Sequence, residues 1–254
     1  APVIGGYLDA FFGWKANFSM LLIVGVIVGG ILFFDLGETN RHRSASFTAQ
    51  LKDYPELFRS RRFWGYCLTA AFASGSFFAF LGGAPFIGTF VFGLETVELG
   101  PYFIFVSIGY LLGNLVSGVY SVRFGINTMM LYGTLVMLAG VAASILALAA
   151  GATHPLAFFG FMLFVGFGNG MTLPNSNAGL VSVRPHLAGS ASGLGGAIQL
   201  LGGASLAAIA GVILTPSSGA YPLLYLMMIT SVLALFVIWY IMRVERQTGA
   251  LDQP

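Results

Sequence analysis

The distribution of charged residues constrains this chain more than any other feature of its sequence. Seven runs contain no Asp, Glu, Lys or Arg, and each is long enough, or nearly so, to cross about 30 Å of hydrocarbon as a helix. They are 17–34, 63–91, 99–122, 128–150, 156–183, 187–214 and 222–242. Only 8% of the residues are charged, against about 25% in a soluble domain. The sequence therefore predicts an all-α, polytopic membrane protein whose first partner is the lipid bilayer.

The basic residues lie on one side of the predicted membrane. Of the 11 Lys and Arg residues, only Lys15 falls on the opposite side. Because cytoplasmic loops carry an excess of Lys and Arg, the linker and the C-terminus are expected in the cytoplasm. The predicted divisions are 1–34 before the linker, a cytoplasmic inter-domain linker at 35–62, a six-helix bundle at 63–242 and a cytoplasmic tail at 243–254. The chain opens at Ala1 without an initiator Met, so we expect a piece of a longer protein.

Polar residues follow one helical face in four of the runs within the predicted bundle. The runs 63–91, 99–122, 156–183 and 187–214 carry such stripes, whereas 128–150 and 222–242 are nearly apolar all round. We expect the first four to line a polar interior and the last two to face lipid. The predicted substrate-cavity residues are Tyr66, Thr69, Ser76, Phe78, Tyr110, Asn114, Asn169, Thr172 and Gln199.

Helix packing is the simpler interpretation of any single polar residue in these stripes, because Ser, Thr and Asn also hydrogen-bond between membrane helices. Glycines four residues apart are interpreted as packing contacts as well, since they let two backbones approach closely. These pairs are Gly109 and Gly113, Gly166 and Gly170, and Gly189 and Gly193.

Two of the polar runs are interrupted late in their length, by "GGAPFIG" (82–88) and by "TLPNSNAG" (172–179). Two helix triplets of opposite topology enclose a site near the bilayer midplane, and their first helices are often broken at corresponding positions. We therefore expect a 3+3 inverted repeat, with Pro85 near the outer face and Pro174 near the inner one. The predicted gating or hinge residues are Gly83, Pro85, Pro174, Asn175 and Asn177, with the amides satisfying carbonyls that the proline frees.

Several stretches resemble the major facilitator superfamily and, within it, the bicyclomycin-resistance (Bcr/CflA) drug:proton antiporters. They are "APVIGG" at the end of the fifth helix, "FGWKANF" at the entry to the sixth, "FFAFLGGAPFIG" in the seventh, and "SNAGLVSVRPHLAGSASGLGGAIQ" between the tenth and eleventh. The resemblance implies that 1–34 holds the end of helix five and helix six, and that 63–242 holds helices seven to twelve. The first four helices are then missing from this chain.

The G-x-x-x-D-R-x-G-R-R loop of that family has a degenerate second copy here, "GVYSVRFGIN" (118–127). Gly118, Arg123 and Gly125 match the motif, whereas its aspartate and its final basic pair are replaced. The loop is therefore not expected to form a charged latch. Arg123 is expected either to interact with a helix C-terminus or only to add to the basic side.

The resemblance implies a transmembrane secondary transporter of a bacterial inner (cytoplasmic) membrane. It would export small lipophilic or amphipathic drugs by proton-coupled alternating access, with this chain supplying the C-terminal cavity wall. No carboxylate lies within the seven runs, so we expect protons to use the missing half. The expected energy source is the proton gradient, without a cofactor or metal, and the expected partners are a small-molecule substrate but no nucleic acid. We expect a monomer.

Other functions remain open at this stage. An exporter of a small metabolite would use the same cavity wall. A seven-helix receptor or light-driven pump is disfavoured, because 222–242 contains no lysine to hold retinal. An enzyme is disfavoured too, since the membrane runs hold no cluster of His, Cys, Asp and Glu, and Cys67 is the only cysteine. No catalytic residues are predicted.

Overall fold

The structure, a computed structural model, describes residues 2–35 and 54–249, and the regular elements in those two ranges are helical. The helices are α1 (Pro2–Phe12), α2 (Lys15–Asp35), α4 (Arg61–Phe86), α5 (Thr96–Phe124), α6 (Ile126–Ala149), α7 (Leu156–Phe159), α8 (Met162–Ser182), α9 (Ala188–Ile213) and α10 (Tyr221–Gly249). A π-helical turn, Ile87–Val91, follows α4, and a 3-10 turn, Pro185–Leu187, precedes α9. In this described part, 7 helices are long and apolar enough to cross a membrane. They coincide with the seven predicted runs, so the all-α polytopic fold class is confirmed.

Local sequence signals set several of the helix ends. The backbone N–H of Phe63 donates to the Ser60 hydroxyl at 3.3 Å, which caps the start of α4. Glu95 and Glu98 form a capping box at the start of α5. Gly125 separates α5 from α6 with a φ of 81°, a conformation that residues with a Cβ adopt rarely. The charged residues therefore lie at helix ends, as the uncharged runs predict.

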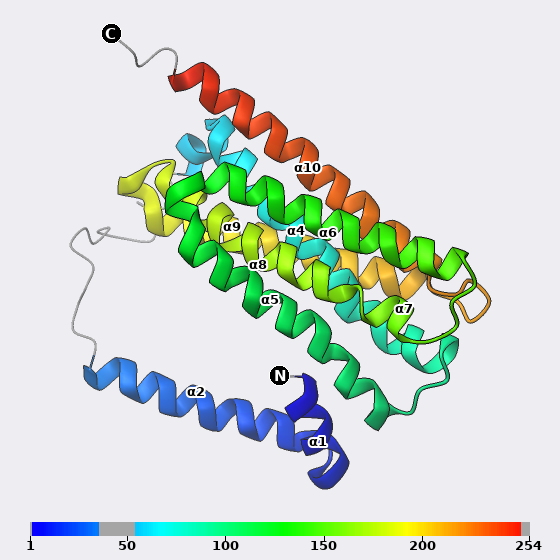
Figure 1. The fold of residues 1–254 in the computed structure, drawn as a ribbon. Coiled ribbons are helices and arrows are strands. Elements are labelled where there is room, and N and C mark those ends of the chain that lie inside the picture. The colour runs from blue at the N-terminus through cyan, green and yellow to red at the C-terminus, as the bar shows by residue number, and fades with distance from the viewer. Residues whose placement is uncertain (1, 36–53, 250–254) are drawn as a thin grey trace.

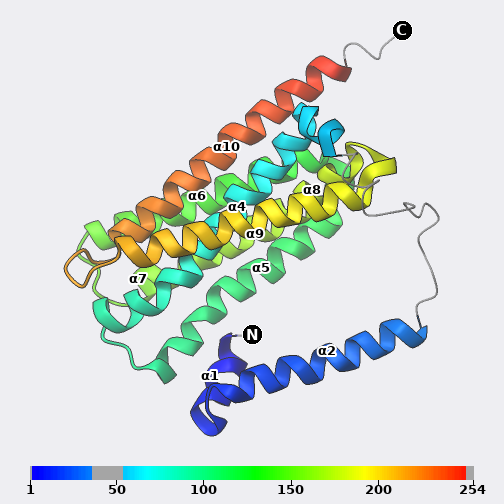
Figure 2. The same cartoon turned by 180° about the vertical axis from the view of Figure 1, so that it is seen from behind.

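Six helices pack into a bundle of two layers, while α2 stands apart from it (Figure 1). One layer is a row in the order α5, α8, α4, α9, and the other consists of α6 against α8 and α10 against α4. Figure 2 shows the same bundle from behind. In α2 no residue is buried; the helix contacts α1, and α1 contacts α5. The four polar runs thus form the row, and the two apolar runs form the layer behind it.

The packing partners repeat with an internal two-fold pattern. The first helix of the first triplet, α4, packs mainly against α9 and α10 of the second triplet. The first helix of the second triplet, α8, packs mainly against α5 and α6 of the first. The pattern is the one expected of two triplets related by inverted topology, and it supports the predicted 3+3 arrangement.

Glycines bring the backbones of α5 and α8 into direct contact. A Cβ added to Gly109 would lie 2.0 Å from the Leu163 carbonyl oxygen, and one added to Gly113 would lie 2.1 Å from that of Phe167. The reciprocal glycines on α8, Gly166 and Gly170, face α5 just as closely. The packing role predicted for these two pairs is confirmed. The prediction was wrong for Gly189 and Gly193 of α9, because no described atom would lie within 4 Å of an added Cβ there.

The basic residues gather at one end of the bundle, which we call the basic end. The start of α4, the end of α5, the end of α8 and the end of α10 lie together there (Figure 1). The described arginines at or next to these helix ends are Arg59, Arg61, Arg62, Arg123, Arg184, Arg243 and Arg246. The α4 helix begins at this end, whereas α8 reaches it only after Pro174, so Pro85 and Pro174 lie toward opposite ends of the bundle. Arg41, Arg43 and Lys52 of the predicted linker lie outside the described residues, as does the end of the predicted tail. The division into 1–34, 35–62, 63–242 and 243–254 stays a prediction.

The glycine contacts give a direct test of the bundle. Gly113→Leu is expected to lower the free energy of unfolding by more than about 2 kcal/mol, because a side chain there meets the α8 backbone. Gly118→Leu, on the same helix but with open space around it, serves as the matched control and should change stability little. Heat unfolding in detergent is followed with a thiol-reactive dye, since Cys67 is buried. Equal losses of stability in the two variants would contradict the packing described here.

Candidate functional site

Three polar residues of the predicted cavity set lie on helices of the row and are not fully buried. Tyr110 and Asn114 lie on α5, where Tyr110 is 40% exposed and Asn114 is half-buried. The Asn114 amide donates to the Tyr110 carbonyl at 2.8 Å, one turn back on the same helix. Gln199 on α9 is half-buried and forms no hydrogen bond with any described residue. These three side chains are therefore accessible to water or to a solute in the arrangement seen here.

A second part of the predicted set is enclosed between helices. Thr172 on α8 faces α6, with its hydroxyl 3.4 Å from the Met130 carbonyl and 3.4 Å from the Thr134 hydroxyl. The Asn169 amide donates to the Val165 carbonyl at 3.1 Å and also faces Met137 of α6. Both residues are buried on the side of α8 that faces α6. Their predicted contact with a solute requires α8 to separate from α6, and it stays a prediction.

The remaining predicted cavity residues lie on α4. The Thr69 hydroxyl donates to the Gly65 carbonyl at 2.8 Å within the helix. Phe78 is half-buried, and its ring fills the space beside Gly203 of α9. Ser76 is buried, and its hydroxyl has no partner among the described residues, as is also true of the Asn169 carbonyl oxygen. Buried polar atoms are nearly always hydrogen-bonded, so a water or a solute group that bonded to either of these two atoms would satisfy an unpaired group.

The two proline segments differ in structure. Pro85 is exposed near the end of α4, and the backbone passes directly into the π-helical turn Ile87–Val91. Gly83 is buried, with Leu214 and Leu223 where its Cβ would lie. π-Helical turns interrupt the regular ladder of helical hydrogen bonds and are frequent at functional sites. The end of α4 therefore departs from regular helix where the sequence predicts a break.

Pro174 lies within α8, which remains one helix from Met162 to Ser182. The Asn175 amide donates to the Met171 carbonyl at 2.7 Å and to the Ser117 hydroxyl at 2.8 Å. Because proline has no N–H, Pro174 leaves the Gly170 carbonyl without its helical donor. The Asn175 amide does not bind that carbonyl but the next one, and its bond to Ser117 links α8 to α5. Asn177 is exposed. The hinge role of this segment stays a prediction.

Of the loop-motif residues, Gly118 and Arg123 lie within α5, and Gly125 lies in the tight turn between α5 and α6. Gly125 supplies the positive φ of that turn, whereas Gly118 faces open space. The guanidinium of Arg123 lies 5.4 Å from the centre of the Phe124 ring. Arg123 also lies in the last turn of α5, where a basic residue is favourable near the helix C-terminus, as one of the two expectations has it.

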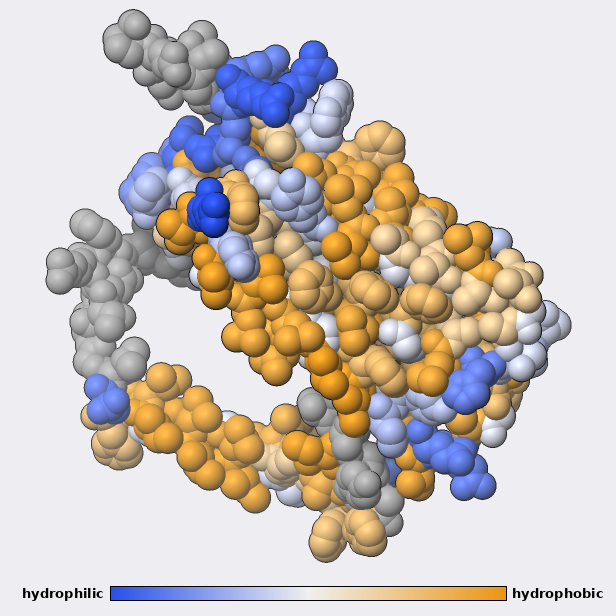
Figure 3. Space-filling model, viewed as in Figure 1, coloured by the Kyte–Doolittle hydropathy of each residue, from blue (hydrophilic) through white to orange (hydrophobic). Residues whose placement is uncertain are grey.

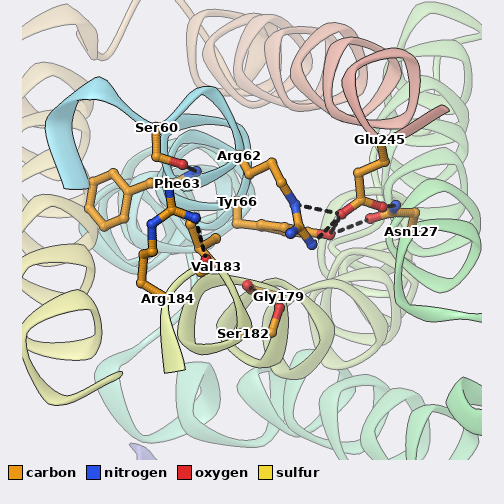
Figure 4. A network of polar contacts seen from close by, with 10 residues as sticks. All are labelled: Ser60, Arg62, Phe63, Tyr66, Asn127, Gly179, Ser182, Val183, Arg184 and Glu245. Carbon is orange, nitrogen blue, oxygen red and sulfur yellow. Dashed lines mark hydrogen bonds and ion pairs between the residues drawn. The ribbon is translucent and has the colours of Figure 1, made fainter. Parts of the chain in front are cut away.

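A polar network at the basic end joins α4, α6 and α10 around Glu245 (Figure 4). Arg62 donates to Glu245 Oε1 from Nη2 at 2.9 Å and from Nε at 3.1 Å. The Tyr66 hydroxyl lies 2.6 Å from the same oxygen, and the Asn127 amide donates to Oε2. Tyr66 also packs its ring on Gly179, and its carbonyl accepts from the Ser176 hydroxyl at 2.6 Å, so α8 is held as well.

Tyr66 thus lies in this network, although the sequence places it in the predicted cavity set. Arg62, Asn127 and Glu245 were not identified from the sequence as functional residues. Glu245 follows the last apolar run and is 179 residues from Tyr66, so no local periodicity connects the two. Asn127 stands where the loop motif has a basic residue, and its amide provides an uncharged link to Glu245. The loop therefore takes part in a latch that the motif itself does not predict.

The network predicts coupled effects on stability. Arg62→Gln and Glu245→Gln are each expected to destabilise the protein, and a double-mutant cycle should give a coupling energy of about 1 kcal/mol. The Arg62 and Glu245 side chains are 37% and 26% exposed, so water partly screens their attraction and limits the coupling energy. Tyr66→Phe should cost about 1 kcal/mol, since it removes only the hydroxyl.

The control cycle uses Arg184 and Glu56, a pair 2.7 Å apart with both side chains nearly half exposed. Because water screens that pair more, its coupling should stay below about 0.5 kcal/mol. Additive losses for Arg62 and Glu245 in heat unfolding would show that the two residues do not act together.

Comparison with known proteins adds independent information. The chain matches the family model of the Major Facilitator Superfamily over residues 1–207. It is 26% identical over 243 residues to the bicyclomycin resistance protein homolog of Haemophilus influenzae, covering 93% of this chain and 60% of that protein. It is 28% identical over 239 residues to multidrug resistance protein D of Escherichia coli, covering 90% of this chain and 57% of the relative.

A third relative is the uncharacterized MFS-type transporter YdgK of Bacillus subtilis, 28% identical over 241 residues, with 92% of this chain and 58% of the relative covered. The chain thus spans less than two thirds of the length of these curated relatives. The family match covers well over half of the chain, and the two interlocked triplets are the arrangement that the resemblance implies. This chain belongs to the major facilitator superfamily, a family of multi-pass membrane transporters and not of enzymes.

Proposed function

We propose that this chain is part of a secondary transporter that exports small lipophilic or amphipathic drugs by alternating access. The proposal rests on the row α5, α8, α4, α9. In this row α4 and α8, the first helices of the two inverted triplets, each pack against the helices of the other triplet. Transporters of this kind bind their solute near the midplane, between such helices. The names of two relatives, a bicyclomycin resistance protein homolog and a multidrug resistance protein, support drugs as the substrate class.

The chemistry of the row suits solutes of mixed polarity. Tyr110, Asn114 and Gln199 offer hydrogen-bonding groups on helices that also expose apolar and aromatic side chains. None of the three carries a charge, so this wall would bind a lipophilic solute without requiring an opposite charge on it. In the proposal, this half supplies the neutral wall of the cavity, and the unpaired Ser76 hydroxyl and Asn169 carbonyl become accessible as helices separate.

Energy would come from the proton gradient, without a bound cofactor. The uncharged runs hold no carboxylate, so the proposal assigns proton transfer to residues outside this chain. The protein would lie as a monomer in the bacterial inner membrane, with the basic end and the C-terminus in the cytoplasm. Its partners would be the lipid bilayer, protons and the exported solute, and no nucleic acid.

The cavity wall is tested in the full-length parent protein by drug-efflux assays with Asn114→Ala, Gln199→Ala and Asn169→Ala. Loss of one amide contact is expected to weaken transport of hydrogen-bonding drugs about 5-fold and to alter the substrate profile. Tyr110→Ala should act similarly, and Tyr132→Ala on α6, 53% exposed, is its matched control. Unchanged substrate profiles in all three amide variants would refute the proposed wall.

Proton coupling is tested separately with a protonophore in cells that express the full-length protein. Collapse of the proton gradient should raise drug accumulation to the level of cells without the protein, because efflux then has no driving force. Depletion of ATP at a maintained gradient is the control and should leave efflux running. Efflux that persists after the gradient collapses would contradict the proposed energy source.

A further inference from the structure

A groove opens between α6 and α10 at the basic end, on the surface of the second layer. Its volume is about 370 Å³, and it is lined by Leu131, Trp239, Met242, Arg243 and Arg246. The groove lies away from the row that carries the proposed solute wall, and no step of the proposed transport uses it. We propose that this groove binds the headgroup and upper acyl chains of one anionic phospholipid.

Two arginines give the groove its positive charge. Arg243 and Arg246 are three residues apart on α10 and therefore share one helical face. Neither has a carboxylate partner among the described residues. Planar guanidinium groups donate in a fork that matches the oxygens of a phosphate. The pair is therefore arranged to accept a phosphate group from the side of the bilayer.

The network around Glu245 explains why these arginines stay unneutralised. Glu245 lies on the same turn of α10, but its oxygens are engaged by Arg62, Tyr66 and Asn127. Its carboxylate thus points toward α4 and α6, as Figure 4 shows, and it compensates Arg62. Glu245 is the acidic residue of this turn, and its carboxylate binds the network. The positive charges of Arg243 and Arg246 therefore remain available to an external anion.

The rest of the groove is apolar and aromatic. The guanidinium of Arg243 lies 5.5 Å from the centre of the Trp239 ring, and Trp239 is 59% exposed one turn deeper along α10. Leu131 and Met242 form half-buried walls below the arginines. Tryptophan is enriched at the depth of lipid headgroups, and basic grooves between membrane helices bind anionic headgroups.

This combination selects a lipid over a soluble anion. A phosphate ion would use only the arginines, whereas a phospholipid also covers Trp239, Leu131 and Met242 with its glycerol and acyl chains. In Figure 3 the hydrophilic surface at the basic end directly borders the hydrophobic flank of the bundle. Such a border is where a lipid places its headgroup and its chains at once.

A second groove on the other side of α10 provides an internal comparison. It is lined by Trp64, Gly65, Leu68, Phe236, Val237 and Tyr240, and it contains no basic residue. An acyl chain entering this groove would meet no charge, so it should not distinguish anionic from zwitterionic lipids. Preference for an anionic headgroup should therefore depend on the groove between α6 and α10.

The proposal is tested by native mass spectrometry of the purified full-length protein with phosphatidylglycerol and phosphatidylcholine added in equal amounts. The wild type should retain phosphatidylglycerol preferentially. Arg243→Gln combined with Arg246→Gln should lower that preference about 10-fold, since each arginine near the surface attracts anionic lipid. Leu131→Trp keeps both charges but fills the groove, and it should reduce phosphatidylglycerol retention as well.

The control is Arg61→Gln combined with Arg123→Gln, which removes the same charge from exposed positions at the same end outside the groove. It should change the lipid preference by less than about 2-fold. An equal loss in this control would overturn the proposal in favour of a diffuse field. Displacement of the lipid by millimolar inorganic phosphate, or full retention in Leu131→Trp, would overturn it too. None of these outcomes depends on drug transport.

Discussion

The fold depends on the exchange of first helices between its two triplets. Because α4 packs on α9 and α10 while α8 packs on α5 and α6, neither triplet has a separate core of its own. The two exchanged helices also meet each other, where the Tyr66 ring covers Gly179 and the Ser176 hydroxyl donates to the Tyr66 carbonyl. The polar residues on the helices of the row are positioned by this interlocking.

The membrane-spanning helices were predictable because one constraint dominates them. Charges are costly in hydrocarbon, so they mark the helix ends, and the uncharged runs end within a few residues of the observed helices. The continuation of α10 from Met242 to Gly249 was not predicted. The charged residues in this stretch end the apolar run, but the helix continues through them. There Glu245 and the neighbouring arginines extend α10 past the membrane boundary and supply the chemistry of the basic end.

The candidate site was only partly predictable. Periodicity correctly places Asn169 and Thr172 on one face of α8, but it does not say which neighbour that face meets. The neighbour is α6, brought close because Gly168 and Gly133 let the two backbones touch. The partners of Tyr66 are distant in sequence, and only the fold brings Arg62, Asn127 and Glu245 to it. Sequence patterns therefore identified the polar residues better than they identified their surroundings.

The glycine contacts make the two triplets mechanically unequal. On α8, side chains added at Gly166, Gly168 and Gly170 would meet main-chain carbonyl oxygens of α5 and α6, whereas one added at Gly179 would meet the Tyr66 ring. On α4, Gly75 faces the end of the Leu206 side chain and Gly65 faces the Ile241 side chain, whereas Gly82 meets the Ala207 main chain at 3.0 Å. The two-fold relation thus holds for the path of the chain and not for its close contacts. Three glycines of α8 would meet main-chain oxygens within 2.4 Å, and one glycine of α4 would meet one at 3.0 Å, so α8 has less room to shift against its neighbours.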